Sequence, residues 1–95
     1  MNKLIKVGAK WCGPCKMMEA KLESIDSDLV TNIVNIDIDS SEGKEFSSKH
    51  QIRSIPVLMI QDSQGNVLDR LPPSTQQPSI DVLKSFISKY ELATQ

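Results

Sequence analysis

Two cysteines three positions apart, Cys12 and Cys15, constrain the fold of this chain more than any other feature. They are its only cysteines, and Gly13 and Pro14 separate them. In the first turn of a helix, side chains at i and i+3 are neighbours with Cβ atoms roughly 5–6 Å apart, close to the reach of a disulfide. Pro14 suits that turn because its φ is already helical and its missing N–H loses no hydrogen bond there. The spacing therefore predicts a helix that begins at these cysteines and holds them close together.

The residues that follow indicate which cysteine is shielded. Apolar side chains recur at helical spacing, at Met18, Leu22, Ile25 and Leu29. Extending this stripe backwards includes Cys15, so we expect Cys15 to begin the buried face of the helix. We expect Cys12 at the exposed mouth, where unpaired N–H groups and the helix dipole favour a thiolate. An exposed, activated thiol beside a shielded one is typical of a pair in which the first attacks and the second resolves.

Structural cysteines and a zinc site are the alternatives to redox chemistry. A zinc site needs about four ligands, whereas the chain has no further cysteine and one histidine, His50. We expect His50 to be exposed, because it lies late in a polar helix. A C-x-x-C pair in a βαβ setting is typical of a thiol redox motif, and we predict no metal site.

Strand and helix patterns alternate along the chain. Strands are predicted at Leu4–Val7, within Val30–Ile38, at Val57–Gln61 and at Val67–Leu71. Helices are predicted at Pro14–Asp26, from Asp39 to about Lys49, and from Ser79 to Tyr90. Asp39 and Glu42 stand at capping-box spacing, which places the start of the second helix at Asp39. The predicted order is βαβαββα, which indicates an α/β protein.

Length and charge limit the classes of function. The chain has 95 residues, enough for one small domain over residues 1–95. Its formal net charge of −1 argues against nucleic acid as an electrostatic partner. No apolar run approaches the roughly 20 residues that span a membrane, so we expect no membrane association. Residues 1–7 lack the long apolar region of a secretory signal, and we expect a cytoplasmic protein.

Two separate segments resemble the thioredoxin family. Trp11-Cys12-Gly13-Pro14-Cys15-Lys16-Met17 resembles the family's active-site signature, and Ile52–Leu58 resembles its cis-proline segment. The resemblance covers roughly Leu4 to Tyr90. It implies the thioredoxin fold, with a four-stranded mixed sheet flanked by three helices. Thioredoxins normally carry a further helix and strand before the first strand predicted here, so the chain resembles a trimmed thioredoxin with an open sheet edge.

The resemblance implies a protein disulfide reductase that exchanges thiols through the catalytic residues Cys12 and Cys15. Its partners are then disulfide-containing protein substrates and thioredoxin reductase, with no bound cofactor and a monomeric state. Two alternatives stay open. One is a non-enzymatic subunit that binds a partner protein through the thioredoxin surface. The other is a glutaredoxin-like enzyme that uses glutathione, which Trp11 and Gly13-Pro14 disfavour because glutaredoxins usually have proline and an aromatic residue between their cysteines.

Several residues around the dithiol are expected to support it. By resemblance, Pro56 follows a cis bond and lies against the dithiol, and the backbone of Ile55 pairs with an extended substrate. The alternative for Pro56 is a proline that simply opens a strand. Trp11 is interpreted as a flat platform beside the substrate rather than a packing residue. By resemblance, the apolar rim is completed by Ile38, Ile55, Pro72 and Pro73.

Lys6 departs from the family pattern. Thioredoxins place a buried aspartate six residues before the first cysteine, with a lysine facing it, whereas this chain has Lys6 there and Asn35 near the facing position. Two placements stay open. Lys6 either reaches the end of a short edge strand and contacts nothing, or it lies under Cys15. In the second case, a charged ammonium favours the thiolate, or a neutral amine acts as a base.

Overall fold

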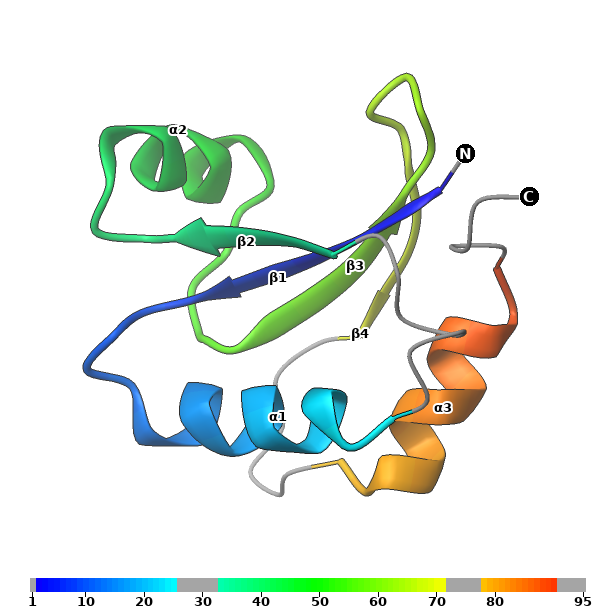
Figure 1. The fold of residues 1–95 in the computed structure, drawn as a ribbon. Coiled ribbons are helices and arrows are strands. Elements are labelled where there is room, and N and C mark those ends of the chain that lie inside the picture. The colour runs from blue at the N-terminus through cyan, green and yellow to red at the C-terminus, as the bar shows by residue number, and fades with distance from the viewer. Residues whose placement is uncertain (1, 26–32, 72–77, 91–95) are drawn as a thin grey trace.

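The structure is a computed structural model that describes residues 2–25, 33–71 and 78–90. Its elements follow the predicted order (Figure 1). In chain order they are β1 (Lys3–Gly8), α1 (Gly13–Glu23), β2 (Ile33–Asp37), α2 (Ser41–Lys49), β3 (Val57–Gln61), β4 (Val67–Leu71) and α3 (Ile80–Ser88). The predicted fold class, a four-stranded mixed sheet with three helices, is confirmed. None of the described helices is long and apolar enough to cross a membrane.

The four strands pair in the order β2-β1-β3-β4. β1 pairs in parallel with β2, whereas the β1–β3 and β3–β4 pairs are antiparallel. β1 is therefore central, and β2 and β4 are the edges of the described sheet. The placement of Lys6 on an edge strand is wrong, because β2 covers one side of β1 and β3 covers the other.

Helices cover both faces of the sheet, with α1 and α3 on one face and α2 on the other (Figure 1). The core on the α1 and α3 side comprises Leu4, Met18, Leu22, Ile25, Leu58, Ile60, Leu83, Phe86 and Ile87. Three of the four predicted stripe residues of α1 lie in it, and the fourth, Leu29, is outside the described residues. Alternation along β1 and β3 explains why these strands supply both cores, since successive side chains point to opposite faces.

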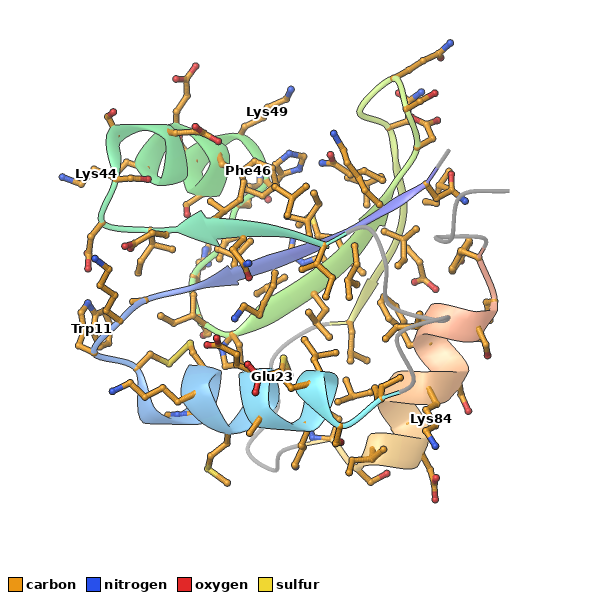
Figure 2. All side chains as sticks on the ribbon, viewed as in Figure 1. Trp11, Glu23, Lys44, Phe46, Lys49 and Lys84 are labelled. Atoms are coloured by element: carbon orange, nitrogen blue, oxygen red, sulfur yellow. A yellow bond between two sulfur atoms is a disulfide. The ribbon has the colours of Figure 1, made fainter. Side chains whose placement is uncertain are left out.

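The core beneath α2 comprises Ile5, Val7, Ile36, Val57 and Met59. Phe46 packs against it from the sheet-facing side of α2, while Lys44 points away from the sheet (Figure 2). His50, predicted to be exposed, is half-buried because its ring lies 4.3 Å from that of Phe46. α2 is therefore attached to the sheet by few apolar side chains.

Predicted boundaries of all three helices differ from the structure, and α3 ends at Ser88 rather than at Tyr90. α1 ends at Glu23, with Ser24 as its C-cap, whereas the predicted end at Asp26 lies outside the described residues. The predicted cap at Asp39 is wrong. Ser40 caps α2 instead, because its Oγ accepts a hydrogen bond from the N–H of Gly43 at 2.9 Å. The strand predicted within Val30–Ile38 is found at Ile33–Asp37.

Candidate active site

The candidate site lies at one end of the sheet, where three strand ends meet. β1 and β2 are parallel and end together, with Gly8 opposite Asp37. β3 begins beside them, since Val57 pairs with Val7. The segments next to these ends therefore gather in one place: 9–12 after β1, 38–40 after β2 and 55–56 before β3. Both predicted motifs fall within this group.

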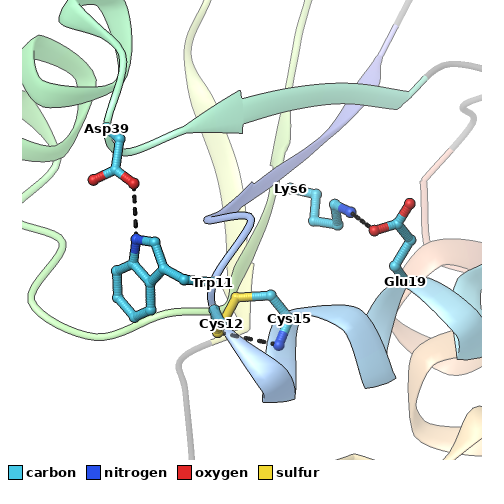
Figure 3. The surroundings of a disulfide bond; sticks show 6 residues. All are labelled: Lys6, Trp11, Cys12, Cys15, Glu19 and Asp39. Carbon is cyan, nitrogen blue, oxygen red and sulfur yellow. Dashed lines mark hydrogen bonds and ion pairs between the residues drawn. A yellow bond between two sulfur atoms is a disulfide. The ribbon is translucent and has the colours of Figure 1, made fainter.

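Cys12 and Cys15 are joined by a disulfide in the first turn of α1, with their Cα atoms 5.2 Å apart (Figure 3). Cys12 is the N-cap residue, and its Sγ accepts a hydrogen bond from the N–H of Cys15 at 3.2 Å. Pro14 lies in the same turn, as predicted from its fixed φ. A backbone N–H directed at Cys12 stabilises negative charge on that sulfur.

The expected difference in exposure between the cysteines is wrong for the disulfide form. Cys12 is 5% exposed and Cys15 is 4% exposed. The bond brings the two sulfurs together. The segment before Cys12 forms a turn, in which the N–H of Cys12 donates to the oxygen of Ala9 at 3.2 Å. The surroundings still differ. Gly13 and Pro14 are exposed next to Cys12, whereas Cys15 lies against β1 at Gly8.

Gly8 is a residue that the sequence patterns did not single out. A Cβ atom on Gly8 would lie 3.1 Å from the Sγ of Cys15 and 3.3 Å from its Cβ. At these distances a side chain would require Cys15 or β1 to shift by a few tenths of an ångström, so glycine favours the close approach of β1 and the active-site helix. The only available signal was a glycine at the end of a strand pattern.

Trp11 extends into solvent beside the disulfide and is 67% exposed. Its indole points toward the start of α2, where Nε1 donates a hydrogen bond to Oδ2 of Asp39 at 2.8 Å (Figure 3). Asp39 is itself positioned because its N–H donates to Oδ1 of Asp37 at 2.9 Å. Asp39, which was expected to cap α2, thus holds the indole of Trp11 by a hydrogen bond beside the disulfide.

The Ile55–Pro56 bond is cis, and Pro56 is buried. Ile38 and Ile55 are half-buried and pack against the core beneath α2. The N–H of Ile38 donates to the oxygen of Gly8 at 3.0 Å, which ties the end of β2 to the active-site loop. The structure brings Ile38 and Ile55 together at one apolar cluster. Pro72 and Pro73, the other expected members of the rim, lie outside the described residues.

Lys6 points from β1 toward α1, where its Nζ lies 3.3 Å from Oε2 of Glu19 (Figure 3). The Lys6 side chain is 12% exposed, and that of Glu19 is 55% exposed. Lys6 pairs in register with Asn35, as expected. The idea that Lys6 contacts nothing is therefore wrong.

A cavity of about 510 Å³ lies between α1 and the paired strands β1 and β2. Cys15, Lys6 and Glu19 all contribute to its wall. Sequence reasoning missed Glu19, although its position four residues after Cys15 places both side chains on one face of α1. Within the described part of the chain, there is no group of three side chains suited to bind a metal ion.

The chain is similar to known thioredoxins. The family model for thioredoxin matches residues 1–89. A thioredoxin from Porphyra purpurea is 31% identical over 90 residues, which cover 92% of this chain and 78% of that protein. A thioredoxin from Bacillus subtilis is 38% identical over 52 residues, which cover 55% of this chain. The match spans 50% of the length of that protein.

A solved structure supports the same relationship. A mutant thioredoxin from Halobacterium salinarum superimposes with a TM-score of 0.74 and is 25% identical. The alignment covers 99% of this chain and 78% of that one. The similarity therefore extends over nearly all of the chain rather than the cysteine motif alone.

Proposed function

Because the chain belongs to the thioredoxin family, we propose that it is a protein disulfide reductase acting through Cys12 and Cys15. The observation that carries this proposal is the disulfide between its only two cysteines, at the N-terminus of α1. The proposal covers one thioredoxin-like domain over residues 1–95 that acts as a monomer. It includes a cytoplasmic location, where cellular reductants keep thiols reduced.

The proposed reaction has two thiol–disulfide exchanges. The thiolate of Cys12 attacks one sulfur of the substrate disulfide, and the other substrate sulfur leaves and takes a proton from solvent. Cys15 then loses its proton and attacks Cys12, which forms the Cys12–Cys15 disulfide and releases the second substrate thiol. Two electrons pass from the protein dithiol to the substrate, and a thioredoxin reductase returns the protein to its reduced form.

Cys12 is the proposed attacking thiol because it accepts the N–H of Cys15 at the helix N-terminus. Hydrogen bonding to the charged form and the helix dipole both favour a thiolate there. Cys15 is the proposed resolving thiol, since it lies against Gly8 on β1. Gly13 and Pro14 set the turn that brings the two sulfurs together.

The proposed substrate surface surrounds Cys12. Trp11 offers a large exposed ring held by Asp39. Ile38 and Ile55 offer half-buried apolar contacts, and the proposed surface includes the buried Pro56. In this proposal an extended substrate segment pairs with the backbone at Ile55, and the rim includes Pro72 and Pro73.

The reductase activity is tested with insulin as a model protein disulfide, supplied separately with thioredoxin reductase and with glutathione. We expect turnover with thioredoxin reductase and none above background with glutathione. Cys15→Ser should accumulate mixed disulfides on Cys12, identified by mass spectrometry, whereas Cys12→Ser should trap no substrate. Adducts found mainly on Cys15 in the Cys12→Ser variant would reverse the assignment of the two thiols.

The same assay separates the alternatives. Reduction with glutathione alone would indicate a glutaredoxin-like enzyme. Absence of reduction with either donor, together with full biological activity of Cys12→Ser, would indicate a subunit that binds a partner protein without chemistry.

A further inference from the structure

The cavity beside Cys15 is lined by several charged residues. Its titratable side chains, apart from Cys15, are Lys6 on β1, Lys10 in the following loop, Lys16 and Glu19 on α1, and Asp37 on β2. Each of these elements therefore contributes at least one charged residue to the lining of the space that Cys15 borders. The reactivity of the Cys15 thiol depends on how these charges balance.

Lys6 is the most enclosed cation of this group. Its side chain is 12% exposed, whereas Lys10 and Lys16 are exposed and their charges are screened by solvent. Asp37 is already engaged, because its Oδ1 accepts the N–H of Asp39 at 2.9 Å. Lys6 is thus the cation of this group least screened by solvent, and its Nζ lies 3.3 Å from Oε2 of Glu19, whose side chain is 55% exposed.

The fold places this pair on the same faces of β1 and α1 as Gly8 and Cys15. Lys6 and Gly8 are two residues apart on β1, so they face the same helix, and Gly8 is in contact with Cys15. Cys15 and Glu19 are four residues apart on α1 and also share a face. The ion pair therefore bridges β1 and α1 about one helical turn beyond the sulfur of Cys15.

We propose that the Lys6–Glu19 ion pair tunes the protonation of Cys15 in the reduced protein. The ammonium of Lys6 stabilises the Cys15 thiolate, and the carboxylate of Glu19 limits that stabilisation. The inference rests on the proposed reductase function, because resolution requires Cys15 as a thiolate. In that step the S–H bond of Cys15 breaks and its proton passes to solvent. Its electron pair forms the bond to Cys12, and the bond from Cys12 to the substrate breaks.

This role predicts effects of opposite sign for the two partners. In Lys6→Met, the carboxylate of Glu19 stands uncompensated near Cys15 and disfavours the thiolate. In Glu19→Gln, the ammonium of Lys6 is uncompensated and favours it. In the double variant, the two changes offset each other. An ion pair that only joined β1 to α1 would show the same loss of stability in both single variants and no opposing change in reactivity.

The test follows the resolving step itself. Reduced protein is mixed in a stopped-flow instrument with a chromogenic aromatic disulfide. The first thiolate released reports attack by Cys12, and the second reports resolution by Cys15. The rate of the second phase is measured from about pH 5 to pH 9, a range that brackets ordinary thiol ionisation.

We expect the pH midpoint of resolution to rise by about 0.5 unit in Lys6→Met and to fall by about 0.5 unit in Glu19→Gln. At neutral pH the rate should change about twofold in each direction, because a more acidic thiol is also a weaker nucleophile. The double variant should lie close to the parent protein. Lys6→Arg, which keeps the cation, should also retain the parent midpoint.

Glu23→Gln is the matched control for charge. Glu23 lies one turn beyond Glu19 on α1 and lines only the neighbouring cavity of about 290 Å³, which Cys15 does not border. Its removal should leave the midpoint unchanged. Circular dichroism verifies the fold of each variant. If Lys6→Met does not fold, Glu19→Gln still tests the proposal, because the exposed Glu19 tolerates substitution.

Three results would overturn the proposal: midpoints that move in the same direction in both single variants, midpoints that do not move, or a shift in Glu23→Gln equal to that in Glu19→Gln. Failure of the proposed function has a different signature. A protein that does not reduce insulin but shows the opposing shifts retains the tuning pair and lacks the reductase activity.

Discussion

At the scale of single residues, the close packing of Gly8 against Cys15 determines how near the dithiol can lie to the sheet. The separation of 3.1 Å between a Cβ on Gly8 and the Sγ of Cys15 is shorter than ordinary van der Waals contact. Any side chain at position 8 must therefore displace either the cysteine or the strand. Gly13 lies between the two cysteines, and a Cβ atom added to it would have no neighbouring atom within 4 Å.

Gly8→Ala should lower the free energy of unfolding of the oxidised protein by about 1–3 kcal/mol, the usual cost of overpacking. Gly13→Ala, with open space around it, should change that free energy by less than about 0.5 kcal/mol. Urea denaturation of the disulfide form measures both. Equal losses in the two variants would mean that Gly8 is not restricted by Cys15.

The hydrogen bond from Trp11 to Asp39 gives a second prediction at this scale. Asp39→Ala removes the acceptor, so the indole should move more freely and substrate docking should weaken by about 1 kcal/mol, or fivefold in KM. Trp11 is the only tryptophan, so its fluorescence anisotropy reports the motion directly. Asp69→Ala is the control variant. Asp69 accepts a hydrogen bond from the hydroxyl of Tyr90 and does not take part in the Trp11–Asp39 contact. Unchanged anisotropy in Asp39→Ala would contradict the restraint.

At the scale of elements, α2 depends on its first turn because it buries few apolar side chains. Ser40 both accepts from the N–H of Gly43 at 2.9 Å and donates to the oxygen of Asp37 at 2.6 Å. A Cβ on Gly43 would collide with that same oxygen of Asp37. The start of α2 is therefore fixed against the end of β2, close to the residues that hold Trp11.

Ser40→Ala should reduce the free energy of unfolding by about 1 kcal/mol, as expected for loss of an N-cap. Ser41→Ala, at the exposed first position of the helix, should be neutral or slightly stabilising because alanine has the higher helix propensity. Thermal or urea unfolding measures the change in the free energy of unfolding for each variant. If Ser41→Ala proved the more damaging, the cap would be misassigned.

Much of this arrangement was predictable from the sequence. Periodicity identified the helices and strands because each element buries one face, and the C-x-x-C spacing located the start of α1. The cap of α2 was misassigned because Asp39 and Ser40 are both good caps, and the choice depends on Trp11, which is distant in sequence. Glu19 was missed for a similar reason: an exposed glutamate gains significance only when β1 brings Lys6 beneath it.

At the scale of the whole molecule, His50 couples stability to pH. Its burial, followed by the charges of Lys49 and Arg70, lowers the pKa of His50 below its usual value of 6.5. The unfolded state therefore takes up a proton first as the pH falls. The contribution of neutral His50 to stability is present above pH 6.5 and is lost as the pH falls below that value.

The free energy of unfolding should accordingly decrease between pH 7 and pH 5, and His50→Gln should make that slope shallower. The effect is modest because His50 is only half-buried. Asp62, whose pKa is lowered chiefly by its hydrogen bond with the backbone of Asn66, titrates below its usual 3.8 and leaves this range unaffected. Denaturation at several pH values measures the slope, and an unchanged slope in His50→Gln would contradict the assignment.

The course of β3 has a practical consequence for the use of the molecule. The strand runs from Val57, at the dithiol end, to the turn at 62–66, which lies at the opposite end of the sheet (Figure 1). Its five residues span roughly 16 Å. The turn is braced by Asp62, which accepts the N–H groups of Gln64 and Asn66, while Gln64 itself is exposed. An electrode linker or fluorescent reporter attached at Gln64 would therefore leave the dithiol end of the sheet unobstructed, as an immobilised redox probe requires.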